Sequence, residues 1–267
     1  MSGRRVRCAG RRQGKLVNYF SNYFLKIAAA AAIVFGCAAS VSAAPVLMLD
    51  SGHNPEKPGA RSWRGIDEMV YNDRFVAELA PALQSDGWDV RLTRLPGESV
   101  SLSARADAAT QAQARLFLSI HHDSAQLIYL REVETPTGKT YQSVRPITGY
   151  SIFVSGLNPR FDDSFCAARF LGRELLSLGR APNLLHAEPP DRGGENRPLL
   201  NKKFGIYRFD HLAVLRRAAV PAVLLEIGVI VDAADEAYVD DMAKRSAMIA
   251  AIIRAVRPFR DRVTCPE

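Results

Sequence analysis

Residues 116–120 read LFLSI and lead directly into a pair of histidines at 121–122. Two other apolar runs end in a similar way: PVLML (45–49), which leads into DSGH (50–53), and PAVLL (221–225), which leads into Glu226. Short, continuous apolar runs are typical of strands that are buried on both faces of a sheet. All three runs end at side chains that can bind a metal, so they predict both the fold and the place of a site.

Strand and helix patterns alternate along the rest of the chain. Asn72, Phe75 and Leu79 recur at helical spacing, and Asp86-Gly87 follows as a stop signal. We expect strands at 45–49, 88–93, 116–120, 151–155, 211–215 and 220–225, and helices at 67–85, 101–114, 163–178 and 235–256. This alternation predicts a single α/β domain, with a mostly parallel central sheet covered by helices on both faces.

Two stretches do not follow this alternation. Residues 124–149 are polar and contain Pro and Gly, and residues 181–204 are interrupted by several prolines and by Gly193-Gly194. We expect both to be long surface loops, inserted between the histidine pair and Glu226. Loops of such length in a compact domain are usually functional or disordered.

Four positions are candidates for one metal site. Ligands of open α/β sheets bind at the carboxyl ends of the strands, where His53, one histidine of the pair 121–122 and Glu226 are expected. Glu68 begins the helix that carries Asn72 and lies on its core-facing side, where an unpaired carboxylate is costly. Two histidines and one carboxylate leave a fourth position for water, which is the pattern of a catalytic zinc site. Glu226 is then the candidate general base.

Each candidate also has an interpretation that needs no metal. His53 could be a surface residue of a Gly/Pro-rich loop, and either histidine of the pair could be a hydrogen-bonded core residue, since successive side chains of a strand point to opposite faces. Glu68 could simply be favoured by the positive end of the helix dipole. Glu226 is the hardest to explain in this way, because it interrupts the apolar run 220–231.

The first 43 residues have the pattern of a signal peptide. Seven Lys and Arg residues and no acid accompany an apolar stretch from Ile27 to Ala39, and Val41-Ser42-Ala43 forms a small-x-small cleavage site. We expect cleavage after Ala43, which leaves 44–267 as the catalytic domain. A retained membrane anchor, twin-arginine export through Arg11-Arg12 and acylation of Cys37 are the alternatives.

The net charge of the whole chain is +7, which at first suggests nucleic-acid or membrane partners. Without the basic leader, however, the numbers of basic and acidic residues are equal. The sequence therefore gives no electrostatic support for nucleic-acid binding.

Two cysteines lie beyond the leader, Cys166 and Cys265. An oxidising compartment would permit a disulfide between them, but Cys166 could also be a small core residue of its helix. The sequence does not decide between these interpretations. Neither cysteine has the CxxC spacing of a zinc knuckle or of a redox motif.

At the candidate positions the chain resembles the zinc-dependent N-acetylmuramoyl-L-alanine amidases, bacterial peptidoglycan hydrolases with a mixed α/β catalytic domain. Five segments carry the resemblance in order: LDSGH (49–53), GIDE (65–68) with Tyr71-Asn72, LTR (92–94) with Ser101-Leu102 through Arg105, SIH (119–121) and PAVLLEIG (221–228). It covers the chain from about Val46 to the final helix. The resemblance implies that His53, Glu68 and His121, rather than His122, bind zinc, and that Glu226 is catalytic.

We also assign two supporting residues. Asn72 would orient Glu68, and Arg105 would brace the packing of helix against sheet. The chain departs from the family at Ser51, where Pro is usual, at Asn54-Pro55, where Gly-Gly is usual, and at His122-Asp123, where a small residue and Asn are usual. These departures concern loop shape and substrate fit and remove no ligand.

The interval between His121 and Glu226 is long for the family. Some relatives carry an inhibitory helix there, which an activator protein displaces, whereas the extra length in this chain is loop-like. His186 lies in this interval and could contact substrate or zinc, but we interpret it as an exposed loop residue.

Together these observations predict an exported, monomeric zinc hydrolase, most simply periplasmic. It would cleave the amide bond between the lactyl group of N-acetylmuramic acid and the L-Ala of the stem peptide. Its candidate partners are peptidoglycan and an activator protein. The alternatives are a zinc carboxypeptidase or deacetylase that acts on cell-wall material, and a non-catalytic wall-binding or activator protein.

Overall fold

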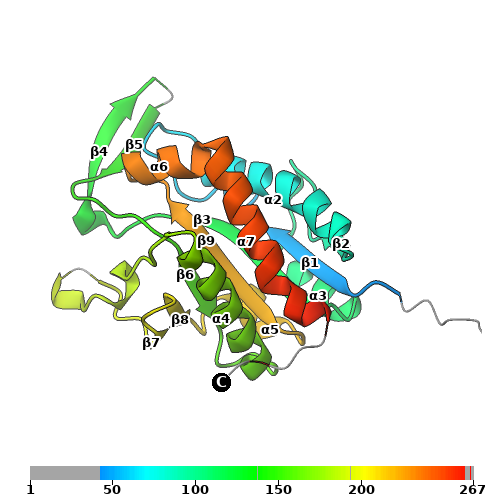
Figure 1. Cartoon of the computed structure of the whole chain (residues 1–267). Coiled ribbons are helices and arrows are strands. Elements are labelled where there is room, and N and C mark those ends of the chain that lie inside the picture. The colour runs from blue at the N-terminus through cyan, green and yellow to red at the C-terminus, as the bar shows by residue number, and fades with distance from the viewer. Residues whose placement is uncertain (1–42, 137, 193, 262–264, 266–267) are drawn as a thin grey trace, which may run out of the picture. The chain divides into compact units, whose positions relative to one another are not determined.

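The central sheet determines where each candidate side chain lies. The computed structural model describes residues 43–136, 138–192, 194–261 and 265, so the predicted leader up to residue 42 lies outside the described residues. The strands are β1 Val46–Ser51, β2 Asp89–Leu92, β3 Leu116–Asp123, β4 Leu130–Thr135, β5 Gly138–Ser143, β6 Ser151–Val154, β7 Leu199–Asn201, β8 Ile206–Arg208 and β9 Ala222–Val229. Seven of these described strands form one sheet in the order β2-β1-β3-β9-β6-β8-β7 (Figure 1).

The sheet is mostly parallel, as predicted. β1 pairs in parallel with both β2 and β3, β3 pairs in parallel with β9, and β6 pairs in parallel with β8. The pairs β6–β9 and β7–β8 are antiparallel. The carboxyl ends of β1, β3 and β9 therefore meet at one edge, which is where ligands of such sheets bind.

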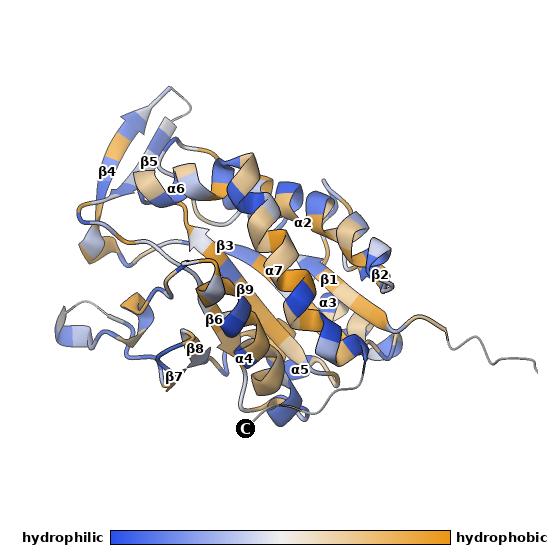
Figure 2. Cartoon of the chain, viewed as in Figure 1, coloured by the Kyte–Doolittle hydropathy of each residue, from blue (hydrophilic) through white to orange (hydrophobic). Residues whose placement is uncertain are grey.

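Helices cover both faces of the sheet. They are α2 Glu68–Ser85, α3 Leu102–Gln111, α4 Phe161–Ser177, α5 Ala213–Arg217, α6 Ala233–Asp240 and α7 Met242–Arg260, with short 3-10 turns at Leu127–Tyr129, Leu185–Ala187 and Pro190–Arg192. Side chains of α2, α4, α6 and α7 join one core layer, and those of α3 and α5 join the other. Neighbouring strand residues such as Phe117 and Leu118 enter opposite layers, which explains the continuous apolar strands seen in Figure 2.

The first predicted loop is wrong in part. Within residues 124–149, β4 and β5 form an antiparallel hairpin that pairs Leu130 with Ser143. Its strands carry mostly charged and polar side chains, and half of their residues are exposed. A ribbon without an apolar face lacks the period-two pattern by which strands are recognised in sequence.

The second predicted loop is also more ordered than expected. Residues 181–204 contain two 3-10 turns, and their last part forms β7, which extends the central sheet. Both Leu185 and His186 are buried. Several prolines in this stretch prevent a regular helix, but they do not prevent burial.

Two other elements differ from the prediction. The expected strand 211–215 is instead a turn followed by the first residues of α5, because an apolar run of four residues does not distinguish a strand from a helical turn. The expected helix 235–256 is two helices, with a break at Asp241. The side chain of Asp241 accepts a hydrogen bond from the backbone N–H of Lys244, so it acts as the N-cap of α7.

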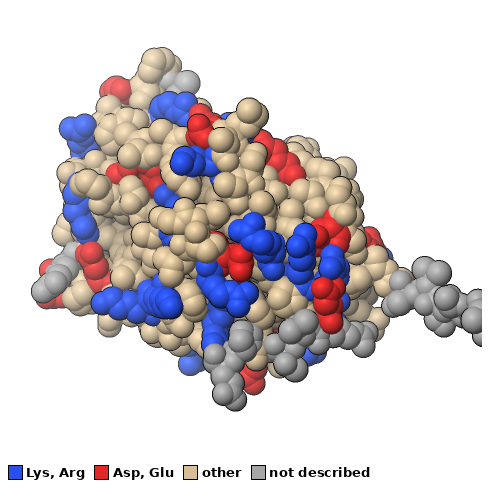
Figure 3. All heavy atoms as spheres, in the orientation of Figure 1, with Lys and Arg blue, Asp and Glu red and all other residues tan. Residues whose placement is uncertain are grey.

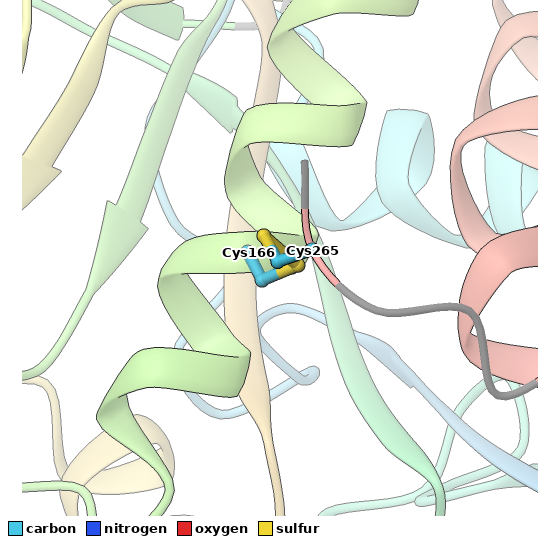
Figure 4. The surroundings of a disulfide bond; sticks show 2 residues. All are labelled: Cys166 and Cys265. Carbon is cyan, nitrogen blue, oxygen red and sulfur yellow. A yellow bond between two sulfur atoms is a disulfide. The ribbon is translucent and has the colours of Figure 1, made fainter. Parts of the chain in front are cut away.

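The structure pairs the two cysteines beyond the leader. Cys166 of α4 forms a disulfide with Cys265 in the C-terminal segment, with a Cα–Cα distance of 5.6 Å (Figure 4). The bond closes a loop of 99 residues in sequence separation. Disulfides of this kind persist in oxidising compartments, which is compatible with the predicted export.

The surface carries no single dominant charge on the face shown in Figure 3, where Lys and Arg are interspersed with Asp and Glu. Among the described residues, no helix combines the length and the apolar character needed to cross a membrane.

Candidate metal centre

The candidate residues converge at the carboxyl edge of the parallel strands. His53 follows β1 by two residues, His121 lies in β3, and Glu226 lies in β9, directly paired with His121. Glu68 is the first residue of α2, which packs against β1 and β3. Four positions distant in sequence are thus brought to one place by the strand order β1-β3-β9.

The carboxylate of Glu68 lies between two imidazoles. Its Oε2 is 2.9 Å from His53 Nε2, and its Oε1 is 3.0 Å from His121 Nδ1. One candidate ligand atom from each of the three residues lies within 4.8 Å of the other two. Two imidazole nitrogens and one carboxylate oxygen form a donor set that suits zinc.

Glu68 is held in place by its surroundings. It is buried, and it accepts hydrogen bonds from the backbone N–H groups of Ala60 and His122 and from Asn72 Nδ2, each at 3.2 Å. Burial alone would raise the pKa of Glu68, but the hydrogen bonds and charges of His121 and His53 lower it below its usual value. The cluster therefore keeps an ionised carboxylate available to a cation.

His53 is oriented from its other ring nitrogen. Its Nδ1 lies 3.1 Å from the carbonyl oxygen of Lys57, which leaves Nε2 facing Glu68. A backbone partner on the second nitrogen is the usual arrangement for a metal-binding histidine. Burial lowers the pKa of His53, but its hydrogen bond to Glu68 and the charge of Glu68 outweigh burial, and the pKa is raised.

Two glycines make room for the cluster. A Cβ atom on Gly52 would lie 2.3 Å from His121 Nε2, and a Cβ atom on Gly59 would lie 2.4 Å from Glu68 Oε2. Gly59 also has a φ of +85°, which favours glycine. The donor atoms, the backbone partner of His53 and this close backbone approach all fit a zinc ion.

Arg105 fixes the loop that carries His53. His53 has a positive φ of 66°, which is uncommon for a residue with a side chain. From α3, the buried Arg105 donates hydrogen bonds to the carbonyl oxygens of His53 (2.6 Å) and Ser51 (2.7 Å) and to Asp50 Oδ1 (2.9 Å). Arg105 thus links α3 to the end of β1 and holds the unusual backbone at His53.

Arg94 also fixes the backbone just before His53, a role that the sequence had not indicated. It donates hydrogen bonds to the carbonyl oxygens of Ser51 (3.1 Å) and Gly52 (3.2 Å), and it pairs with Asp73 Oδ1 at 2.6 Å. Its place in the segment 92–94 gave a family resemblance, but no role could be assigned from type or spacing alone.

His122 lies on the other face of β3. Its Nδ1 is 2.7 Å from Asn72 Oδ1, and the same Asn72 donates a hydrogen bond to Glu68. Burial lowers the pKa of His122 to about 3, so the ring is neutral. Strand alternation thus separates the pair: His121 faces Glu68, whereas His122 supports Asn72 from behind.

Glu226 has a free carboxylate oxygen. Its side chain is partly exposed, and its Oε2 has no hydrogen-bond partner among the described residues. Burial of the carboxylate, followed by the charges of Asp123 and Glu68, raises the pKa of Glu226 well above its usual value. A buried polar atom without a partner is rare and is a common mark of a functional group.

The exposed-loop interpretation of His186 is wrong. His186 is buried, with its Nε2 2.6 Å from Asp123 Oδ2 and its Nδ1 3.1 Å from Glu195 Oε2. Burial opposes the charged ring, but Asp123 and then Glu195 more than offset it and raise the pKa of His186 to about 10. No periodicity marks a residue in a proline-rich stretch, so the sequence could not reveal these partners.

A groove adjoins the candidate centre. It has a volume of about 640 Å³, and His53 and His121 line it together with Lys57, Val100 and Leu102. A larger cavity of about 800 Å³ lies near the amino ends of β3 and β9, beside Arg115 and Cys265, away from the candidate site. Its size alone gives it no chemical role.

Residues 47–258 match the family model of N-acetylmuramoyl-L-alanine amidase, Amidase_3. The chain belongs to this family. Its members are hydrolases, and the matched range contains all four residues of the candidate site.

The similarity to individual relatives is limited in identity or in length. The N-acetylmuramoyl-L-alanine amidase AmiC of Neisseria meningitidis is 35% identical over 80 residues, which cover 30% of this chain and 19% of AmiC. The probable cell wall amidase LytH of Staphylococcus aureus is 26% identical over 216 residues, which cover 80% of this chain and 57% of LytH. The chain thus spans less than two thirds of the length of these curated relatives.

Solved structures share the fold. An N-acetylmuramoyl-L-alanine amidase from Clostridium difficile 630 aligns with a TM-score of 0.61 at 21% identity, covering 82% of this chain and 98% of that chain. CwlD from Clostridioides difficile, solved in complex with the GerS lipoprotein, aligns with a TM-score of 0.59 at 19% identity, covering 82% of this chain and 99% of that chain. The α/β fold inferred from sequence is that of these family members.

Proposed function

We propose that this chain is an exported zinc-dependent hydrolase that cleaves the amide bond between the lactyl group of N-acetylmuramic acid and the L-Ala of the stem peptide. One observation carries the proposal. Glu68 lies between His53 and His121, and Glu226, whose Oε2 has no hydrogen-bond partner within the described part of the chain, lies on the strand next to that of His121. Membership of the amidase family supports the choice of substrate.

His53, Glu68 and His121 would hold the zinc ion. When bound, zinc would supply a Lewis acid that polarises a carbonyl and lowers the pKa of water to about 7. Asn72 keeps the carboxylate of Glu68 in place, and Arg105 keeps the carbonyl of His53 in place. The ligand positions are therefore set by the protein's own hydrogen bonds.

Glu226 would act first as general base and then as general acid. Its free Oε2 can accept a proton from the attacking water, and the resulting carboxylic acid can return that proton to the leaving amine. A raised pKa suits this double role, because the group must be able to both accept and donate near neutral pH.

We further propose that residues 1–43 direct export, most simply to the periplasm, with acylation of Cys37 as the alternative. The substrate partner would be peptidoglycan, and the enzyme would act as a monomer. An activator protein remains a candidate partner. CwlD, which shares the fold, was solved in complex with the GerS lipoprotein.

The proposal is tested by mass spectrometry of purified peptidoglycan after incubation with residues 44–267, which form a compact unit by themselves. We expect peptides that begin with L-Ala and intact glycan strands, with zinc but not with a chelator. A Glu226→Gln variant with normal zinc content is the matched control. Released amino acids would favour a carboxypeptidase, released acetate would favour a deacetylase, and no release by a zinc-loaded protein would count against the proposed activity of the chain alone.

A further inference from the structure

The groove beside the candidate metal centre is lined by three separate segments. They are the loop after β1, the loop that leads into α3, and the start of α5. His53 and His121 also line the groove, so a group bound there lies beside two of the candidate metal ligands. Val100, Leu102 and Leu212 contribute apolar side chains to its walls.

Apart from the histidines, four ionisable side chains line the groove. Asp50 and Arg105 are buried and form an ion pair at 2.9 Å, so their charges are already matched. Glu56 and Lys57 are exposed, and neither forms an ion pair with another of the described residues. The groove therefore offers its free charges on one short turn.

The turn at residues 54–57 is fixed by its own hydrogen bonds. Asn54 Oδ1 accepts hydrogen bonds from the backbone N–H groups of Glu56 (3.1 Å) and Lys57 (2.9 Å). The carbonyl oxygen of Lys57 lies 3.1 Å from His53 Nδ1. The backbone of Lys57 is thus tied to a candidate metal ligand, whereas its side chain stays available to a ligand in the groove. Asn54, which organises the turn, stands where Gly is usual in the family.

The two parts of the proposed substrate differ in charge. The lactyl carboxyl group of the muramyl part is bound in the scissile amide, so it carries no charge. The stem peptide has a free carboxylate at its second residue, D-Glu, whereas its first ammonium group occurs at the third residue. An ammonium group that has no partner in the protein attracts an anionic ligand. The first charge of the stem beyond the scissile bond therefore complements Lys57.

We propose, building on the function proposed above, that the groove receives the stem peptide and that Lys57 binds the free α-carboxylate of D-Glu. Lysine carries a point charge on a flexible four-carbon chain, so it can reach from the turn into the groove. The apolar walls fit the methyl group of L-Ala and the methylene groups of D-Glu. Lys57 is then a specificity-determining residue, which selects stems with a free D-Glu over stems that are amidated at this position.

Two substrates of the same shape isolate this charge. One is N-acetylmuramic acid that carries L-Ala-D-Glu, and the other carries L-Ala-D-isoGln, in which a carboxamide replaces the α-carboxylate. In both, the γ-carboxyl group is blocked as a methylamide. For the wild type we expect a KM about fivefold lower for the D-Glu substrate, the upper end for an exposed ion pair.

Lys57→Met should remove this preference. The KM of the D-Glu substrate should rise to that of the D-isoGln substrate, whose own KM should not change. The kcat and the zinc content should stay close to those of the wild type, because the carbonyl group that faces His53 is retained. Equal changes in both KM values would overturn the proposal.

Three further variants separate charge from shape. Lys57→Arg keeps the charge and should keep the preference for D-Glu. Lys202→Met removes an exposed lysine between β7 and β8, away from the groove, and should leave both KM values as in the wild type. Glu56→Gln removes the neighbouring anion, so the KM of the D-Glu substrate should fall. A rise in Glu56→Gln as large as that in Lys57→Met would show that the shape of the turn matters instead of the charge.

Salt provides a readout that a purely structural role of Lys57 would not change. The Debye length falls from about 10 Å at 0.1 M to about 3 Å at 1 M ionic strength. Over this range the KM of the D-Glu substrate should rise in the wild type but stay constant in Lys57→Met. The same salt dependence in both proteins would contradict a role for the charge.

A longer stem tests which carboxylate Lys57 binds. Two tripeptide substrates carry D-isoGln at the second residue and either diaminopimelic acid or Lys at the third, so they differ by one side-chain carboxylate. We expect Lys57→Met to leave the ratio of their KM values unchanged. A preference for diaminopimelic acid that depends on Lys57, without one for D-Glu, would contradict the assignment to the second residue.

Binding of the two free, blocked dipeptides, measured by calorimetry on the zinc-loaded protein, keeps the test independent of turnover. We expect the dipeptide with D-Glu to bind about fivefold more tightly to the wild type, again the scale of an exposed ion pair, and equally with D-isoGln to Lys57→Met. An inactive wild type with this preference would contradict the proposed activity but support the role of Lys57. Equal binding of both dipeptides by the wild type would contradict that role.

Discussion

Two clusters of histidine and carboxylate lie near Glu226, and they differ in composition. In one, a single carboxylate, Glu68, lies between two imidazoles, those of His53 and His121. In the other, a single imidazole, that of His186, lies between the carboxylates of Asp123 and Glu195. The first cluster offers two imidazoles and one carboxylate as possible metal ligands, whereas in the second a single imidazole is shared by two carboxylates.

This difference shows why the presence of histidine and carboxylate does not by itself indicate a metal site. Two nitrogen lone pairs and one anion gain from a divalent cation, which both imidazoles and the carboxylate can coordinate. A protonated histidine between two anions already has its charges paired and has no lone pair to offer. We therefore expect zinc at the first cluster and a structural role for the second.

The largest effect should come from replacing Glu226, which lies near both clusters. Glu226→Gln removes the proton acceptor, so kcat/KM for stem-peptide release should fall by about 10³-fold, within the range for a general acid–base group. Zinc content should not change. The measurement is the initial rate of peptide release by mass spectrometry. A variant that retained wild-type rate would remove Glu226 from the mechanism.

The next largest effect should be on zinc affinity, which we expect to fall in a variant of the first cluster but not in a variant of the second. Glu68→Gln should weaken zinc binding by at least about 100-fold, because loss of an outer partner already costs about 10–100-fold. Glu195→Gln, the matched change in the second cluster, should leave zinc affinity as in the wild type. Competition with a chromophoric chelator measures both. Equal zinc loss in the two variants would contradict the assignment.

A smaller loss of zinc affinity is expected from replacing Asn72, which contacts Glu68 of the first cluster. Asn72→Ala removes the hydrogen bonds of Asn72 to Glu68 and to His122. Zinc affinity should fall about 10-fold, and the free energy of unfolding should fall by about 1–3 kcal/mol, because the buried Nδ1 of His122 loses the hydrogen bond to Asn72. Chelator competition and urea unfolding measure these separately. Unaltered zinc affinity would show that Glu68 needs no support from Asn72.

The smallest effect should be on thermal stability, through the pH-dependent charge of His186 in the second cluster. The pKa of His186 is raised from 6.5 to about 10, so its charge stabilises the folded state fully below pH 6.5 and ceases to do so as pH rises through about 10. The difference in thermal midpoint between wild type and His186→Asn should therefore shrink between pH 7 and pH 11. Scanning calorimetry measures it. A difference that grew over this range would contradict a charged His186.

The first cluster was predictable from sequence, and the reason is geometric. Parallel buried strands end at a common edge, so the residues after three apolar runs had to meet there. The spacing of Glu68 and Asn72 placed both on one face of a helix, where the structure joins them by a hydrogen bond. The choice between His121 and His122 came only from family resemblance, because strand alternation fixes their separation but not which face is the site.

The second cluster was not predictable from sequence. His186 and Glu195 lie in a stretch without periodicity, and the contact of His186 with Asp123 depends on how this insertion packs against the end of β3. The β4–β5 hairpin was missed for a similar reason, since its strands have no apolar face. Sequence patterns report burial against a core, whereas these elements are held by polar contacts between distant segments.

The most direct test of the comparison is anomalous diffraction at the zinc edge from crystals of residues 44–267 grown with zinc. We predict one strong peak bounded by His53, Glu68 and His121, and no peak at Asp123, His186 and Glu195. A peak at the second cluster, or no peak at the first in a protein with stoichiometric zinc, would contradict the proposed metal centre.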